Sequence, residues 1–217
     1  MTNLVIAILG GTGNEGSGLA LRWAKAGYRI LIGSRTAKRA AQTAADVNAQ
    51  LGLDTVRGLE NAAAAREADL VVLTVPGEAH LPTLESVHAA LPGKILVDAT
   101  ARVAVKDPRP PVGPAAARVA QDLLGPAVRV VAAFQNVPAF ALKKLEMELA
   151  SDVLVCGEDA DAKQQVIQLA TAAGMQAYDA GGLDNALVVE GLTALIISLN
   201  KKYKSKTGGI RVSGINR

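Results

Sequence analysis

The stretch "LVIAILGGTGNEG", residues 4–16, decides the fold of this chain. Its first six residues are aliphatic, which is typical of a strand buried on both faces of a sheet. The apolar run ends abruptly at a cluster of glycines. A helix is then predicted from Glu15 to Ala26, with Gly27 as its stop. The chain therefore opens with a strand, a glycine-rich turn and a helix.

The glycine-rich turn fits the pattern G-x-G-x-x-G over Gly11-Thr12-Gly13-Asn14-Glu15-Gly16. In this pattern the first glycine permits a tight turn, the second lets the backbone approach a pyrophosphate, and the third lets the helix lie close to the strand. The pyrophosphate would accept hydrogen bonds from free N–H groups at the helix N-terminus. The alternative is a purely structural turn, but its position between a buried strand and a helix favours dinucleotide binding.

Five further apolar runs are predicted to be strands, at residues 29–33, 68–76, 94–100, 128–134 and 151–157. Helical stretches lie between most of them, and this alternation predicts an α/β fold with a Rossmann-type, doubly wound, mostly parallel sheet. We expect right-handed crossovers. We also expect an NADP-binding Rossmann domain over residues 1–150. A small C-terminal α/β lobe would cover residues 151–217 and end in a long helix, roughly residues 183–203.

The second predicted strand ends in a burst of three cations, Arg35, Lys38 and Arg39, with no acidic residue close by in the sequence. NAD-binding versions of the fold place an acid about 20 residues after the glycines, where it binds ribose hydroxyls. Here the segment offers Ser34, Arg35 and Arg39, which suit a 2′-phosphate. We therefore predict NADP(H) as the cofactor. The alternative is a solvated basic helix start, which would oppose the helix dipole.

Composition argues against several other classes of protein. Half of the 217 residues are hydrophobic and the net charge is +3, unlike a uniformly basic nucleic-acid binder. The single cysteine, Cys156, allows no intrachain disulfide framework. No apolar run approaches the roughly 20 residues of a membrane span, and the N-terminus lacks the basic region of a signal peptide. We therefore expect a cytoplasmic protein with no nucleic-acid or membrane partner and no metal site.

Candidate catalytic side chains are scarce. Ligands of such folds bind at the carboxyl ends of the strands, here residues 74–76, 98–100 and 133–138. Of the two histidines, only His80 follows a strand end closely enough to line that site. Reduction of a carbonyl or imine usually needs a proton source, whereas hydride transfer between two cofactors needs chiefly position and orientation. The sequence therefore offers a cofactor site but no obvious proton donor.

The chain resembles the NADPH-dependent reductases of the deazaflavin coenzyme F420, also called F420:NADP oxidoreductases. The matching stretches are "ILGGTGNEGSGLALRWAKAGYRILIGSR", "AFQNVPA", "DVLVCGED", "DAGGLDNALVVEGLTALIISLNKKYK" and "GGIRVSGI". They cover most of the chain in order. The resemblance implies a Rossmann domain with a small C-terminal lobe. It also implies direct hydride transfer between nicotinamide C4 and deazaflavin C5 by positioning, without a catalytic side chain.

The resemblance also implies roles for particular residues. NADP would be held by Thr12 to Glu15, Ser34, Arg35 and Arg39. The nicotinamide side would be bordered by Val75 and Ala139. One or both rings would be bordered by His80, Val137, Pro138 and the segment Gly208-Gly209-Ile210.

Two other functions stay open at this point. One is an NADP-dependent reductase of a small imine or carbonyl, although such enzymes need a larger helical C-terminal domain than the residues after 157 provide. The other is a non-enzymatic NADP(H) sensor, although nothing resembles an appended effector domain.

The C-terminal part of the chain carries two further expectations. Residues 201–217 hold six basic residues and no acidic one, so they could attract the anionic phosphodiester and oligoglutamate tail of F420. The alternative is a solvated basic tail. The long helix before them is apolar over much of its circumference, which predicts a homodimer through this helix. The alternative is a helix buried within its own subunit.

Overall fold

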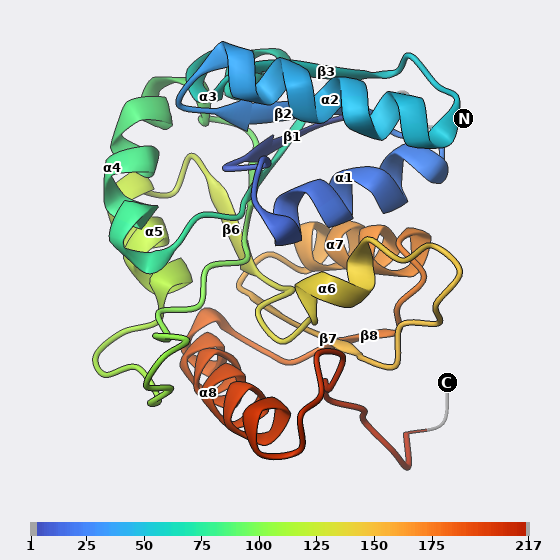
Figure 1. Ribbon diagram of the computed structural model, residues 1–217. Coiled ribbons are helices and arrows are strands. Elements are labelled where there is room, and N and C mark those ends of the chain that lie inside the picture. The colour runs from blue at the N-terminus through green and yellow to red at the C-terminus, as the bar shows by residue number, and fades with distance from the viewer. Residues whose placement is uncertain (1–3, 216–217) are drawn as a thin grey trace.

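The computed structural model describes residues 4–215 and contains eight strands and a set of flanking helices (Figure 1). The strands are β1 (Val5–Leu9), β2 (Arg29–Ser34), β3 (Val56–Glu60), β4 (Leu70–Leu73), β5 (Ile95–Asp98), β6 (Arg129–Ala132), β7 (Val153–Gly157) and β8 (Ala177–Asp179). The helices are α1 (Asn14–Lys25), α2 (Ala37–Leu51), α3 (Asn61–Glu67), α4 (Gly77–Val87), η1 (His88–Ala90), α5 (Ala116–Leu124), α6 (Ala139–Leu142), α7 (Ala160–Ala172), η2 (Leu183–Asn185) and α8 (Ala186–Lys202).

The strands form one sheet in the order β3-β2-β1-β4-β5-β6-β7-β8. Neighbouring strands are parallel, except that β6 and β7 are antiparallel. The predicted doubly wound α/β fold, with its long C-terminal helix, is confirmed. The sheet continues through β7 and β8 without a break, so the proposed division at residue 150 falls inside one sheet and stays a prediction.

Both faces of the sheet are buried, and β1 shows why. Ile6 and Ile8 pack into an apolar cluster with α1, α2 and α7, whereas Ala7 and Leu9 pack into a second cluster with α3, α4, α5 and α8. Side chains alternate between the two faces of a strand, so a strand covered on both sides must be apolar at every position. This is the physical origin of the unbroken aliphatic run at residues 4–9.

All six predicted strands are present, and two edge strands were missed. β3 forms one edge, and its 5-residue sequence VRGLE has only two large apolar residues, Val56 and Leu59, which follow no period-2 pattern. It is fixed by α2, because Asn48 Nδ2 donates to Val56 O at 2.8 Å and Val56 N donates to Asn48 Oδ1 at 3.1 Å. β8 is only 3 residues long. Short edge strands carry little hydrophobic pattern, which explains both omissions.

A buried arginine joins α1 to the C-terminal part of the chain. Arg22 is 9% exposed, and burial lowers the pKa of its guanidinium. Its Nε, Nη1 and Nη2 atoms donate hydrogen bonds of 2.9–3.3 Å to the carbonyl oxygens of Ala141, Leu142, Lys144, Met147 and Ala173. These carbonyls belong to α6, the irregular segment after it and the end of α7. One charged side chain therefore supplies donors to backbone carbonyls at the ends of two helices and in an irregular segment, where the regular hydrogen-bonding ladder stops.

The helix η2–α8, Leu183–Lys202, is long and apolar enough to cross a membrane by length and composition alone. One face nevertheless packs on the protein through Ala186, Val189 and Glu190. The fully buried Glu190 carboxylate accepts hydrogen bonds from Ala116 N and, at 3.0 Å, from Arg102 Nε. This contact anchors α8 to the start of α5 and to the loop after β5.

We expect replacement of Arg22 by Met to lower the free energy of unfolding by about 3 kcal/mol or more, because several buried carbonyls lose their donors at once. Urea denaturation monitored by circular dichroism measures this loss. The matched control is Arg29→Met, which removes an exposed arginine and should change stability by no more than about 0.5 kcal/mol. Equal effects of the two substitutions would contradict this account.

Candidate functional site

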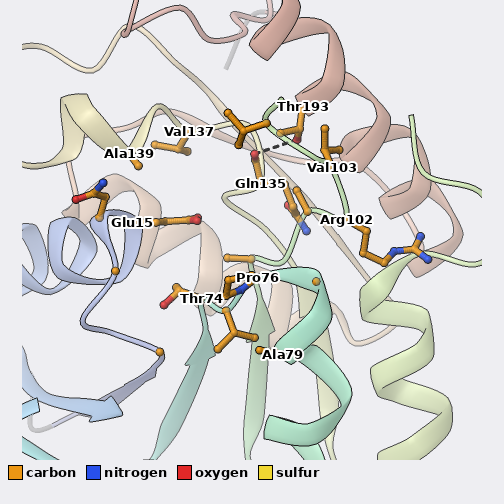
Figure 2. Close-up of a pocket in the computed structure, with 18 of the residues that line it drawn as sticks. Glu15, Thr74, Pro76, Ala79, Arg102, Val103, Gln135, Val137, Ala139 and Thr193 are labelled. Carbon is orange, nitrogen blue, oxygen red and sulfur yellow. Dashed lines mark hydrogen bonds between the residues drawn. The ribbon is translucent and has the colours of Figure 1, made fainter. Parts of the chain in front are cut away.

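A cavity of about 990 Å³ lies at the carboxyl ends of β1, β2, β4, β5 and β6, between the sheet and α8 (Figure 2). This volume is at the upper end of the range for small-molecule sites. Twelve of the residues predicted for the site line it: Thr12, Gly13, Asn14, Glu15, Ser34, Arg35, Arg39, Val75, Val137, Pro138, Ala139 and Gly208. Four predicted residues do not: Gly11, Gly16, His80 and Gly209.

The glycines of the first turn divide into two kinds. A Cβ on Gly11 would lie 2.6 Å from Ile8 O, and a Cβ on Gly16 would lie 2.6 Å from both Gly11 Cα and Thr74 Oγ1. These two glycines allow α1 to begin directly against β1 and the end of β4. Gly13 is different, because a Cβ there would meet only Gly10 O at 3.6 Å. Its backbone is open to the cavity, as an approaching pyrophosphate requires.

The N-terminus of α1 offers hydrogen-bond donors to this cavity. Gly13 is the N-cap residue, and no side chain caps the helix there. The first N–H groups of a helix have no partner within it and attract anions. With a backbone cradle and an uncapped helix end together, the turn fits a pyrophosphate group.

The basic end of the cavity lies at the end of β2. Ser34 is buried, whereas Arg35 and Arg39 are exposed and neither forms an ion pair with an acid anywhere in residues 4–215. Glu60 on β3 lies opposite Ser34 in the sheet but does not line the cavity. Two free guanidinium groups beside a hydroxyl suit a phosphate, since arginine binds phosphate with two parallel hydrogen bonds.

His80 lies behind the cavity wall and not in it. The side chain is 3% exposed, and its Nε2 lies 2.6 Å from the Oδ2 atom of Asp98, which is fully buried. The other carboxylate oxygen of Asp98 accepts a hydrogen bond from Thr100 N at 2.9 Å. His80 therefore holds the end of β5 in place. Because its side chain does not line the cavity, the structure gives no support to its predicted contact with a bound ring.

Polar side chains after β6 form a network that the sequence did not reveal. Thr193 Oγ1 on α8 donates to Gln135 O at 3.0 Å and accepts from Asn136 Nδ2 at 2.9 Å. Gln135 Nε2 donates to Asp98 O at 3.0 Å. The segment "AFQNVPA" showed the two amides, but their partner on α8 is more than 50 residues away in the sequence. The network fixes the cavity wall that carries Val137.

Two amide oxygens in this wall have no hydrogen-bond partner in the described part of the chain. They are the buried Gln135 Oε1 and Asn136 Oδ1. Buried polar groups are nearly always paired, so unpaired acceptors beside a cavity suit a ligand that brings N–H donors. The preceding residue, Phe134, has a φ of 75°, which is rare for a residue with a side chain. Strain of this kind tends to collect at functional sites.

The C-terminal segment closes one side of the cavity. Asn200 on α8 holds Gly208 from both sides, since its Nδ2 donates to Gly208 O at 3.2 Å and its Oδ1 accepts from Gly208 N at 3.0 Å. A Cβ on Gly209 would lie 2.5 Å from Ser151 Oγ, so this glycine allows the segment to pack against Ser151, two residues before β7. Gly208 therefore lines the cavity while Gly209 supports it.

Two titratable groups have strongly raised pKa values. Burial and, to a smaller degree, the nearby carboxylate of Asp98 raise the pKa of Glu15 from 4.5 to about 8. Burial is the largest cause that raises the pKa of the Cys156 thiol to about 11. Cys156 lies in β7 and does not line the cavity, so its thiol is an inert part of the core. Glu15 does line the cavity.

The doubly wound sheet, the open Gly13 turn and the basic pocket after β2 together define a dinucleotide-binding Rossmann protein. Residues 5–102 match the family described as NADP oxidoreductase coenzyme F420-dependent. The chain belongs to the F420-dependent NADP reductase family, because relatives of that name are 41–43% identical over 97% of it. This confirms the resemblance found in the sequence.

Two relatives and one solved structure support that assignment. An F420-dependent NADP reductase of Methanocaldococcus jannaschii is 43% identical over 97% of this chain and 98% of its own length. That of Methanothermobacter marburgensis is 41% identical over the same shares of the two chains. The crystal structure of a candidate F420-dependent NADP reductase from Arthrobacter sp. FB24 is 25% identical with a TM-score of 0.82, covering 97% of this chain and 100% of that one.

The two kinds of glycine should respond differently to alanine. Gly16→Ala should lower the free energy of unfolding by about 1–3 kcal/mol, because its Cβ would collide with the Gly11 backbone. Gly13→Ala should leave stability within about 0.5 kcal/mol, since its Cβ meets only an ordinary contact. Chemical denaturation of the protein without nucleotide measures both. A large loss in the Gly13 variant would mean that this turn is tighter than its geometry indicates.

Proposed function

We propose that this protein transfers a hydride directly between NADP(H) and the deazaflavin coenzyme F420. The observation that carries the proposal is one continuous cavity with three matching parts. It runs from the free Arg35 and Arg39 side chains, past the open Gly13 turn, to an apolar wall at Val137 and Pro138. Membership of the F420-dependent NADP reductase family supports the same substrates.

NADP(H) fits the half of the cavity that lies over β1 and β2. The 2′-phosphate would lie between Ser34, Arg35 and Arg39, and the pyrophosphate would lie on the Gly13 turn at the start of α1. The nicotinamide would then reach the carboxyl ends of β4 and β6, near Val75 and Ala139. This order follows the general rule that ligands of such sheets bind outside the carboxyl ends of the strands.

The deazaflavin would lie beside the nicotinamide, against Val137, Pro138 and Gly208. Apolar walls exclude water and hold two flat rings in register, which is the main requirement for direct hydride transfer. We propose no covalent or metal-assisted step. The protein's own contribution is to orient the two rings and to provide polar groups, such as the free oxygen of Gln135, for their N–H edges.

The basic C-terminal segment is proposed to attract the anionic tail of F420. Lys206 lines the cavity, and its Nζ lies 5.6 Å from the centroid of the Phe140 ring. Lys201 is engaged differently, because its Nζ donates to Lys106 O at 2.9 Å. An anionic tail leaving the cavity past Lys206 would meet a positive surface, which raises association rates at low ionic strength.

The other two functions lack a comparable observation. Reduction of a small imine or carbonyl would leave much of this cavity empty beside NADP(H). A non-enzymatic NADP(H) sensor would need a second element that responds to the bound coenzyme. We also propose a cytoplasmic location, in keeping with the single free thiol at Cys156.

Mixing the purified protein with NADPH and oxidised F420 should bleach the visible absorbance of the deazaflavin, and NADH should do so far more slowly. Bleaching with neither nucleotide, in a protein that binds NADPH, would reject the proposed reaction. Equal rates with both nucleotides would keep the reaction but reject the assignment of the 2′-phosphate to Arg35 and Arg39.

Variants of Arg35 and Arg39 test whether these side chains bind the 2′-phosphate. Arg35→Gln and Arg39→Gln should each raise the KM for NADPH by roughly 10- to 100-fold and leave the KM for NADH nearly unchanged, because each removes a charge-assisted hydrogen bond to the 2′-phosphate. The control is Arg66→Gln, which removes an exposed arginine at the end of α3, away from the cavity.

A homodimer through α8 is also proposed. Val188, Leu195 and Leu199 are each more than half exposed on this helix, which is unusual for three large aliphatic side chains on one element. Light scattering should report a dimer at micromolar concentration, and the double substitution Leu195→Lys and Leu199→Lys should produce a monomer. Leu123→Lys, on α5, is the control and should leave the dimer intact. A wild-type monomer would reject the proposal.

A further inference from the structure

We propose that Glu15 distinguishes the two redox states of the nicotinamide: its carboxyl group keeps its proton when NADPH is bound and loses it when NADP⁺ is bound. This inference rests on the proposed binding of NADP(H). Glu15 would then do more than contribute backbone to the glycine turn. Its side chain would make the affinity for NADP⁺ depend on pH.

The first support is where the side chain points. Glu15 lies in the first turn of α1, and Figure 2 shows its carboxyl group extending into the cavity between Thr74 and Ala139. Thr74 follows β4, and Ala139 begins α6 after β6. These are the strand ends at which the nicotinamide is expected. The phosphate-binding arginines lie at the other end of the cavity, after β2.

The second support is that one carboxyl oxygen has no partner. Glu15 Oε1 is shielded from solvent and forms no hydrogen bond to any of residues 4–215, while the residue as a whole is only half-buried and lines the cavity. An isolated ionised carboxylate in such a place is costly, so the group prefers its neutral form until a positive charge arrives. The oxidised nicotinamide ring is a cation and the reduced ring is neutral.

The charged groups around Glu15 act in opposite directions. Burial and the Asp98 carboxylate at the end of β5 disfavour ionisation, and Asp98 is itself in contact with His80 of α4. The N-terminus of α1 favours ionisation through the helix dipole. The other charged side chains that line the cavity are Arg35, Arg39, Glu78, Arg102 and Lys206. The resulting pKa of about 8 leaves Glu15 mostly protonated at neutral pH.

These charges determine how the affinity for NADP⁺ changes with pH. A cationic ring beside Glu15 lowers its pKa, so NADP⁺ binding releases a proton at any pH between the lowered value and about 8. NADP⁺ affinity therefore rises with pH over this window and levels off above it. NADPH brings no ring charge and should not release this proton. Titration of the 2′-phosphate is common to both coenzymes and cancels in their comparison.

Isothermal titration calorimetry at pH 7 in phosphate and in Tris counts the protons released, because the two buffers have different ionisation enthalpies. NADP⁺ should release close to one proton more than NADPH. The ratio of the Kd for NADP⁺ to the Kd for NADPH should fall by up to about tenfold per pH unit between pH 6 and pH 8. Equal proton release by both coenzymes would overturn the inference.

Variants assign the proton to one residue. Glu15→Gln has nearly the same shape and cannot ionise, so the extra proton and the pH dependence of the Kd ratio should both disappear. Glu15→Met provides a second uncharged variant if the first fails to fold. The control is Glu78→Gln, which removes an exposed carboxylate elsewhere on the cavity rim and should retain the extra proton.

The outcomes separate this inference from the proposed function. An extra proton that persists in Glu15→Gln would assign the effect to another group and overturn the inference alone. Loss of binding of both coenzymes by the wild-type protein would instead reject the proposed function, and this inference with it. Deazaflavin bleaching is not needed for either decision.

Discussion

The buried guanidinium of Arg22 is the contact on which the shape of the site depends. It lies near the end of α1, the helix whose first turn forms the glycine-rich side of the cavity, and it holds the carbonyls of α6 and of the segment that follows. α6 begins at Ala139, directly after Pro138 on the opposite wall. The spacing of the two walls is therefore set by a residue that does not itself line the cavity. Its planar fork of donors is what allows one side chain to satisfy so many acceptors.

Close packing fixes the strand ends that form the floor of the cavity, just as Arg22 fixes the spacing of its walls. Gly16 allows the start of α1 to touch Thr74, and buried polar groups then link the strand ends: His80 to Asp98, and the Asp98 backbone to Gln135. A chain of such contacts is rigid because leaving any member unpaired would be costly. Rigidity of this kind matters in a site that acts by orienting two rings.

Prediction from the sequence succeeded where a pattern is local. The aliphatic run of β1, the spacing of the glycines and the cations after β2 each depend on a few adjacent residues, and the structure has a buried strand, a tight turn and two cavity-lining arginines at these positions. Contacts between distant segments could not be found this way. Neither the pairing of Thr193 with Gln135 and Asn136 nor the burial of His80 against Asp98 has a signal in either partner alone. The edge strands β3 and β8 were missed because half-exposed strands carry a weak pattern.

The proposed reaction transfers a hydride and needs no proton donor, so the role of the acid Glu15 in this site is to balance charge. When the hydride leaves, the nicotinamide gains a positive charge inside a cavity that is already lined by the cations Arg35, Arg39, Arg102 and Lys206. A carboxyl group that can ionise near the ring offsets that charge, while a permanently ionised one would have disfavoured the neutral ring and the fold itself. With a pKa of about 8, Glu15 is neither permanently neutral nor permanently ionised, so its ionisation can change with the redox state of the coenzyme.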